Sequence, residues 1–115
     1  MGTVLRRGDV YWVDFEPAVG GEIKNTRPAV IVSNNAANAA LNRVLVVPLT
    51  SQTGRLYPGE ALVQLRGQTS KAVADQQSTA SKLRFKTRIG ALAAADLALI
   101  EKTILLQLGI VGPRS

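Results

Sequence analysis

Two strand ends in the sequence carry side chains that could act on a phosphodiester. Arg27 stands directly before the apolar run at residues 28–32, and Pro28 biases it toward an extended conformation. A guanidinium held in this way can give a phosphate two parallel hydrogen bonds and keeps its charge, although Arg27 could also cap the strand or pair with Glu22. After a second apolar run, Thr50 and Ser51 offer hydroxyls that can bind a phosphate oxygen or a 2′-OH, or simply cap a turn.

A basic segment, residues 82–88, could follow a nucleic-acid backbone. It places four cations and one aromatic side chain in seven positions. In an extended chain, Lys82, Arg84 and Lys86 would point largely one way and track phosphates, while Phe85 would pack inward or stack on a base. A solvated charged face above a core phenylalanine fits the same pattern.

A polar loop and one glutamine provide weaker candidates. Gly20 and Gly21 could form a hinge or a nest of amides that binds phosphate, and Glu22 and Lys24 belong to the same loop. Gln76 could read a base edge, but glutamine in a strand more often marks the polar face. None of these signals is specific by itself.

Composition limits the chemistry and the partners. The 115 residues contain no cysteine and no histidine, which excludes disulfides, thiolate metal sites and imidazole proton transfer. We expect no metal and no cofactor.

Fourteen Lys and Arg against eight Asp and Glu give a formal charge of +6, which implies an anionic partner: nucleic acid, an acidic protein or a membrane surface. Because no signal peptide or membrane span is visible, we expect a soluble cytoplasmic protein.

Apolar periodicity predicts a small domain of short strands. Strands are expected at residues 10–15, 28–32, 43–49, 60–65, 71–78 and 88–92, with a turn at 67–70. The sole tryptophan, Trp12, is assigned to the core rather than to a stacking platform. Pro48, inside an expected strand, requires a sheet edge, a bulge or the strand end.

Two helices complete the prediction. Ser33, Asn34 and Asn35 can cap a short helix over residues 36–41. A terminal helix over residues 93–108 carries an apolar face and stops at Gly109; that face comprises Leu97, Ile100, Ile104 and Leu108. The fold is therefore expected to be mainly β or α+β: a small β-barrel, with a short helix after the second strand and a C-terminal amphipathic helix. We expect one domain over residues 1–115, with its core at about 6–110 and a tail at 111–115.

The order of several motifs resembles the MazF/PemK family of toxins. The resemblance runs from Arg7 to Ile110 through RGDVY (7–11), GGE (20–22), RPAV (27–30), SN (33–34), VPLTS (47–51) and the final helix ending LGI (108–110). It implies an SH3-like barrel that works as a homodimer. It also implies sequence-specific cleavage of single-stranded RNA without a metal, and neutralisation by a small acidic antitoxin.

The resemblance also implies roles for individual residues. It places a catalytic arginine on Arg27 and a catalytic threonine on Thr50, and it makes residues 20–22 a mobile loop where RNA and antitoxin compete. The expected RNA contacts are Gly20, Gly21, Glu22, Lys24, Ser51, Gln76, Lys82, Arg84 and Lys86. One departure is Ser81, which precedes Lys82 where family members commonly carry Asp.

These residues suggest a hypothesis for the reaction and leave two rivals. The RNA's own 2′-OH would attack the adjacent phosphorus, leaving a 2′,3′-cyclic phosphate and a 5′-hydroxyl. Arg27 would stabilise the developing charge and could also transfer a proton, and Thr50 would position the phosphate. One rival is a binding toxin of the CcdB kind that poisons gyrase. The other is a non-catalytic RNA-binding barrel that uses the basic segment and shows steep salt dependence.

Overall fold

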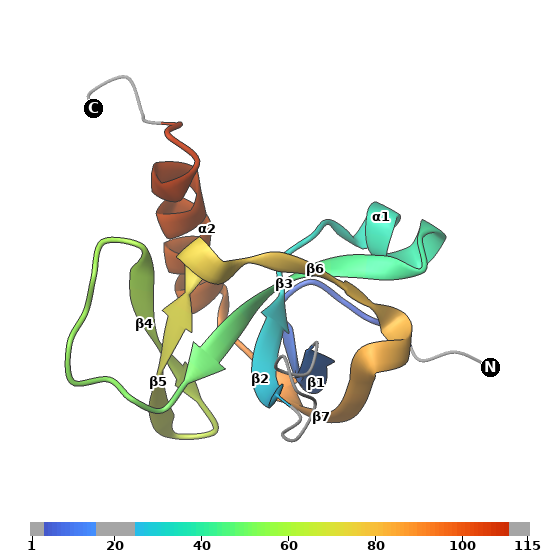
Figure 1. Cartoon of the computed structure of the whole chain (residues 1–115), viewed down its shortest axis with the longest axis horizontal. Helices are drawn as coiled ribbons and strands as arrows, with labels where there is room; N and C mark the ends of the chain where they lie inside the picture. The colour runs from blue at the N-terminus through green and yellow to red at the C-terminus, as the bar shows by residue number, and fades with distance from the viewer. Residues whose placement is uncertain (1–3, 16–24, 111–115) are drawn as a thin grey trace.

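The computed structural model describes residues 4–15 and 25–110 of the chain (Figure 1). Both expected helices form, and the first is capped by the Asn34 side chain, which accepts a hydrogen bond from the Ala37 amide at 2.8 Å. The elements in chain order are β1 (Asp9–Phe15), β2 (Asn25–Ile31), α1 (Asn35–Ala40), β3 (Arg43–Thr50), β4 (Glu60–Leu65), β5 (Gln68–Val73), the 3-10 helix η1 (Ala74–Gln76), β6 (Ser78–Ser81), the 3-10 helix η2 (Lys82–Arg84), β7 (Phe85–Ala91) and α2 (Ala94–Gln107).

The strands form one antiparallel sheet whose two ends curl toward each other. Its order is β4-β5-β3-β2-β1-β7, and β6 also pairs with β3. A Cβ atom on Gly90 of β7 would lie 3.5 Å from Leu65 Cδ1 of β4, and Arg66 Nη1 donates to the Ile89 carbonyl at 3.4 Å. Within the described residues no backbone ladder joins β4 to β7. The α+β class is as expected, but the sheet is curled and open rather than a closed barrel.

The central strand, β3, changes neighbours along its length. Residues 43–46 pair with β6 on one side and residues 46–48 pair with β2 on the other, so that Val46 is opposite both Ser78 and Ile31. Its last two residues pair instead with β5, with Thr50 opposite Lys71. A gap therefore opens between the start of β2 and the end of β3.

Pro28 and Pro48 lie where this pairing changes. The Val32 amide donates to the Leu45 carbonyl of β3 at 2.9 Å, and backbone groups alternate sides along a strand. The missing N–H of Pro28 therefore falls on the β3 side, and the last pair of that ladder is Ala29 with Pro48. By the same alternation Pro48 faces the other side of β3, where pairing breaks between β6 and β5. Pro48 thus sits at a break in the ladder, as expected.

Apolar clusters cover both faces of the sheet. Alternate residues of β1 and β2 point to opposite faces, as the period of two requires. The helix α2 packs beside β4 and η1 (Figure 1), and its Ile100 belongs to the larger cluster. The buried members of that cluster are Val10, Val30, Val47, Leu49, Ala61, Val63, Ala72, Leu92 and Ile100. The smaller one contains Leu5, Tyr11, Val13, Ala29, Ile31, Val44, Val46 and Ala80.

The hairpin between β4 and β5 turns earlier than expected. Arg66 and Gly67 both have positive φ angles, 53° and 81°, which is the backbone of a two-residue type I′ turn. β5 therefore begins at Gln68, whereas the turn was expected at residues 67–70. The strand expected at residues 71–78 is also divided, because η1 separates β5 from β6.

The terminal helix is less amphipathic than expected. Ile100 is fully buried and Leu97 and Ile104 pack against the larger cluster. Leu108, assigned to the same face, is 56% exposed at the helix end, and Leu105 on another side is also exposed. Among the described residues, no helix is long and apolar enough to cross a membrane.

Candidate functional site

A cavity of about 680 Å³ opens where β3 leaves β2. Its walls come from β1, β2, the end of β3, β4, β5, η1, β7 and the loop after β3. The apolar lining residues are Trp12, Pro28, Leu49, Leu65, Val73 and Ile89, and the polar ones are Arg27, Thr50, Ser51, Gln52, Glu60, Arg66, Gln68, Ser70, Lys71 and Gln76. Three cations against one carboxylate make this surface electropositive.

Arg27 and Thr50 reach this cavity from neighbouring strands. Arg27 lies inside β2, opposite Val13 of β1, rather than just before the strand as expected. Thr50 is the last residue of β3. Continuing the β2–β3 register two residues beyond Ala29 and Pro48 sets Arg27 across from Thr50. The two side chains therefore face one space that can hold a phosphodiester.

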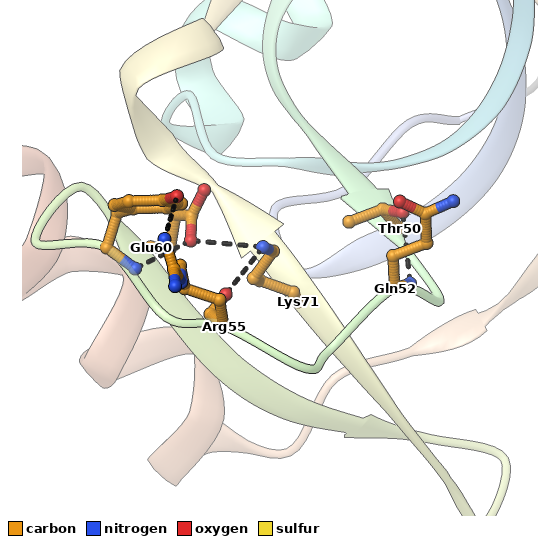
Figure 2. Close-up of polar contacts among 6 residues, drawn as sticks. Thr50, Gln52, Arg55, Glu60 and Lys71 are labelled. Carbon is orange, nitrogen blue, oxygen red and sulfur yellow. Dashed lines mark hydrogen bonds and ion pairs between the residues drawn. The ribbon is translucent and has the colours of Figure 1, made fainter.

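The Thr50 hydroxyl is held in place by the turn that follows it. Its Oγ1 accepts a hydrogen bond from the Gln52 amide at 3.2 Å (Figure 2). This short side-chain-to-backbone contact is typical of Ser and Thr at the start of a turn. Because it uses the oxygen as an acceptor, the hydroxyl proton remains to donate to an anionic oxygen in the cavity.

A lysine of β5 ties the loop after β3 to the cavity wall. Lys71 Nζ donates to the Arg55 carbonyl at 2.9 Å and pairs with Glu60 Oε1 at 3.1 Å (Figure 2). The same Glu60 oxygen accepts from the Tyr57 amide at 2.8 Å. The Lys71 and Glu60 side chains are only 12% and 11% exposed. Since Lys71 is opposite Thr50 in the sheet, this arrangement fixes the loop beside the Thr50 hydroxyl.

The hydrogen bond from the Tyr57 amide is the main reason that the pKa of Glu60 is lowered. The hydrogen bond and the charge of Lys71 act in the same direction, and partial desolvation opposes them. Glu60 is therefore ionised at neutral pH.

Gln76 reaches the cavity because η1 interrupts the strand. The Ala74 amide donates to the Gly59 carbonyl at 2.9 Å, which holds the 3-10 turn against the loop. A Cβ on Gly59 would lie 3.1 Å from Asp75 Cβ, so the close approach favours glycine. Ser51 also lines the cavity. Four of the expected site residues thus share one cavity: Arg27, Thr50, Ser51 and Gln76.

Several lining residues were missed by the sequence reasoning. Trp12 is 42% exposed and faces the cavity, which contradicts its assignment to the core. Trp12 lies on the same face of β1 as the buried Val10, as strand alternation requires. The buried cluster on that face ends at Val10, however, so the Trp12 side chain is exposed. Arg66 carried one usable signal, since it precedes Gly67 in a hairpin turn. Lys71 and Gln68 had no sequence signal that separates them from ordinary polar strand residues.

The basic segment does not line this cavity. Lys82 and Arg84 lie in η2 rather than in an extended strand, and Arg84 Nη1 donates to the Asp14 carbonyl at 3.1 Å. Phe85 packs inward, edge-on to Tyr11 at 5.4 Å. Lys86 is exposed on β7.

Ser81 caps η2, and the expected loop contacts lie elsewhere in the chain. Ser81 Oγ accepts a hydrogen bond from the Leu83 amide at 3.2 Å, a bond that an aspartate could also accept. The candidates Gly20, Gly21, Glu22 and Lys24 fall outside the described residues. Within the described part of the chain, no group of three or more acidic side chains could hold a metal ion.

Comparison with known proteins places the chain in a family. The model of the PemK-like, MazF-like toxins of type II toxin–antitoxin systems matches residues 6–108. The chain belongs to this family. Endoribonuclease MazF9 of Mycobacterium tuberculosis is 36% identical over 116 residues, covering 93% of this chain and 98% of the relative.

Solved structures of family members have the same fold. An endoribonuclease from a mycobacterial species matches with a TM-score of 0.81 and 27% identity, over 98% of this chain and 99% of that one. A mycobacterial endoribonuclease in complex with its cognate antitoxin matches with a TM-score of 0.79 and 29% identity, over 94% and 98% of the two chains.

The opening motif of the family resemblance has a structural role here. Arg7 forms an ion pair with Glu101 of α2, and its Nε donates to the Val32 carbonyl at 3.0 Å. The Arg7 amide donates to Asn35 Oδ1 at 2.7 Å. These contacts join the N-terminal segment to the end of β2, to α1 and to α2, away from the lining of the cavity.

Proposed function

We propose that this chain is the endoribonuclease toxin of a toxin–antitoxin pair and that the cavity beside Arg27 and Thr50 is its active site. The observation that carries the proposal is the convergence of a guanidinium and a hydroxyl, from adjacent strand ends, on one electropositive cavity. The relatives named as endoribonucleases support the same activity. The substrate is single-stranded RNA, cut at a specific sequence and without a metal ion.

The substrate's own 2′-OH is the nucleophile in this proposal. Its oxygen bonds to the adjacent phosphorus and gives its proton to solvent water, and the bond to the 5′-oxygen breaks as that oxygen takes a proton from solvent. The products are a 2′,3′-cyclic phosphate and a 5′-hydroxyl. Negative charge builds on the non-bridging oxygens, where preorganised donors contribute most. The Arg27 guanidinium stabilises that charge, and the Thr50 hydroxyl positions the phosphate.

Glu60 is a poor candidate for the general base. It is the one carboxylate among the described lining residues, and its pKa is lowered, chiefly by the hydrogen bond from the Tyr57 amide. A carboxylate with a lowered pKa takes up a proton less readily near neutral pH. Rate enhancement therefore rests on charge stabilisation by Arg27, with Glu60 holding Lys71 and the loop in position.

Primer extension on a long natural RNA tests the activity. We expect discrete cuts at a recurring sequence, unchanged by EDTA, and resistance of a substrate with a 2′-deoxy sugar at the scissile step. Inhibition by EDTA that added metal reverses would contradict the metal-independent reaction. Binding without any cutting would instead support the RNA-binding rival, and DNA breaks in the presence of gyrase would support the gyrase-poison rival.

Paired variants at Thr50 test its role. Thr50→Val keeps the shape but removes the hydroxyl, and loss of one donor of this kind costs on the order of a hundredfold or more in rate. Thr50→Ser keeps the hydroxyl and should retain most of the rate. Single-turnover cleavage separates the two, and equal rates for both variants would remove Thr50 from the site.

We further propose that two copies pair and that a small acidic antitoxin neutralises them in the cytoplasm. The relative solved with its cognate antitoxin supports such a partner. Leu99, Leu105 and Leu106 of α2 are 42%, 46% and 54% exposed, which gives a partner apolar area to cover. Light scattering after size exclusion should give the mass of a dimer; a monomer at micromolar concentration would contradict the pairing.

A further inference from the structure

Trp12 stands in an unusual position for the sole tryptophan of a small protein. Tryptophan is highly buried on average, yet here 42% of the residue is exposed. Its partner across the β1–β2 ladder is Pro28, the residue directly after Arg27. Both Trp12 and Pro28 line the same cavity as Arg27 and Thr50.

The surroundings of Trp12 combine apolar and amide groups. Leu65 and Ile89 give the cavity an apolar floor, while Gln68 and Gln76 carry amides that can both donate and accept hydrogen bonds. An aromatic face beside cationic groups is how proteins hold single-stranded nucleic acid, because every base has a π-face. Amides can then read the edge of a base whose face is covered.

We propose that Trp12 is a stacking platform for the nucleobase next to the scissile phosphate. This inference rests on the proposed function, because it takes the Arg27–Thr50 end of the cavity as the phosphate position. Arg27 and Pro28 are consecutive in β2 and point to opposite faces, so the guanidinium and the indole opposite Pro28 reach the cavity from two sides of the ladder. The base covers the exposed indole, and Gln68 or Gln76 contacts its edge.

The intrinsic fluorescence of the protein reports this contact directly, because Trp12 is its only tryptophan. The ligand is a single-stranded oligonucleotide of the mapped cut sequence with a 2′-deoxy sugar at the scissile step, or oligo(A) if no cut is found. Titration should quench Trp12, and the same sequence as a duplex should not. Quenching that depends on protein concentration alone would assign the indole to a contact between copies and overturn the proposal.

Variants at Trp12 measure the contribution of stacking. Trp12→Ala should raise the Kd by roughly 5- to 140-fold, the range expected for one stacked base, while Trp12→Phe should keep most of the affinity. Leu41→Ala is the matched control, since Leu41 is also 42% exposed but does not line the cavity. An equal loss for Trp12→Phe and Trp12→Ala would show that the π-face is not used.

An abasic scan of the oligonucleotide identifies the stacked nucleotide without changing the protein. Quenching of the wild-type protein should disappear at one position next to the scissile step, and Trp12→Ala should bind that abasic ligand as well as the wild type does. If no single abasic site abolishes quenching, the platform is excluded. Cleavage that persists while quenching is absent rejects Trp12 alone, whereas quenching without cleavage rejects the proposed function and leaves the platform standing.

Discussion

The cavity and the basic segment both concentrate positive charge, but they hold it in different ways. In the cavity, Arg27 comes from β2, Arg66 from the turn after β4, and Lys71 from β5. These cations are separated in sequence and converge with hydroxyl and amide groups on one concave surface. Such convergence lets several donors act on the same bound group.

In the basic segment, cations that are close in sequence diverge in space. Arg84 donates to the backbone of β1 at Asp14, and Arg88 pairs with Asp9 at 3.2 Å. The hydrogen bond that Arg88 donates to the Asp9 carboxylate raises the pKa of Arg88 further, so that side chain stays charged. Lys86 lies exposed between them on an edge strand. Two of these cations therefore attach the edge of the sheet to β1.

The contrast shows that a run of cations in a sequence does not by itself define a site. A site requires groups of different kinds around one volume, which depends on the path of the strands. In this fold, two prolines and a 3-10 turn redirect the strands around the cavity. The basic segment has a higher density of charge but no cavity that it shares with hydroxyls and amides among the described residues.

The largest effect should come from matched changes of one cation in each region. Arg27→Lys keeps the charge but loses the planar fork of donors, so single-turnover cleavage should slow by on the order of 10² to 10³. Lys86→Gln removes a whole charge from the basic segment and should change the rate by only a few-fold. Near wild-type cleavage by Arg27→Lys, or an equal loss for Lys86→Gln, would erase the difference between the two regions.

Local sequence signals predicted most of the helices and strands, but not whether the sheet closes into a barrel. Alternation located β1 and β4, an apolar run located β3, and the Asn34 cap located α1, because those signals act within a few residues. The early turn at Arg66 was missed because a type I′ turn usually carries Asn, Asp or Gly where this chain has Arg. Whether the sheet closes depends on pairing between β4 and β7, which no local pattern encodes.

The site was predictable only where motif order carried information. Arg27 and Thr50 were singled out because each borders an apolar run, Arg27 before one and Thr50 after another, in an order that resembles a known family. Trp12 was misplaced because alternation gives the face of a strand but not where the core on that face ends. Lys71 was identified only from the strand register, which places it opposite Thr50.

The salt dependence of RNA binding should also differ between the cavity and the basic segment. Each phosphate contact on single-stranded RNA adds about 0.7 to the slope of log K against log salt. If Lys82 and Lys86 contact only the outer part of a long RNA, Lys82→Gln with Lys86→Gln should reduce that slope by about 1.4. The same double variant should leave the slope unchanged for a short RNA that fills only the cavity. A reduced slope with the short RNA would place the basic segment inside the site.

Arg66→Gly should raise the stability of the protein while weakening its binding of RNA in the cavity. A non-glycine residue with a left-handed backbone costs roughly 1–2 kcal/mol, and Arg66 has φ 53°. Glycine removes that cost but adds flexibility to the unfolded chain, so the free energy of unfolding should rise by roughly 0.5–1 kcal/mol. RNA affinity should fall a few-fold, as measured with the 2′-deoxy substrate. Arg66→Asn, which also tolerates this backbone, should behave similarly; unchanged affinity in both would remove Arg66 from the RNA contact.

The smallest effect should come from Glu60→Gln, which loosens the loop without removing a cation from the cavity. Because the pKa of Glu60 is lowered below its ordinary value of 4.5, its ionised form stabilises the fold above that pH, and this contribution is lost as the pH falls through the lower folded pKa. The difference in unfolding free energy between wild type and Glu60→Gln should be constant from pH 7 to 5.5 and should shrink toward zero in more acidic buffer. Urea unfolding at each pH measures it. A difference that persisted undiminished at acid pH would mean that the side chain stabilises the loop by shape rather than by its charge on Lys71.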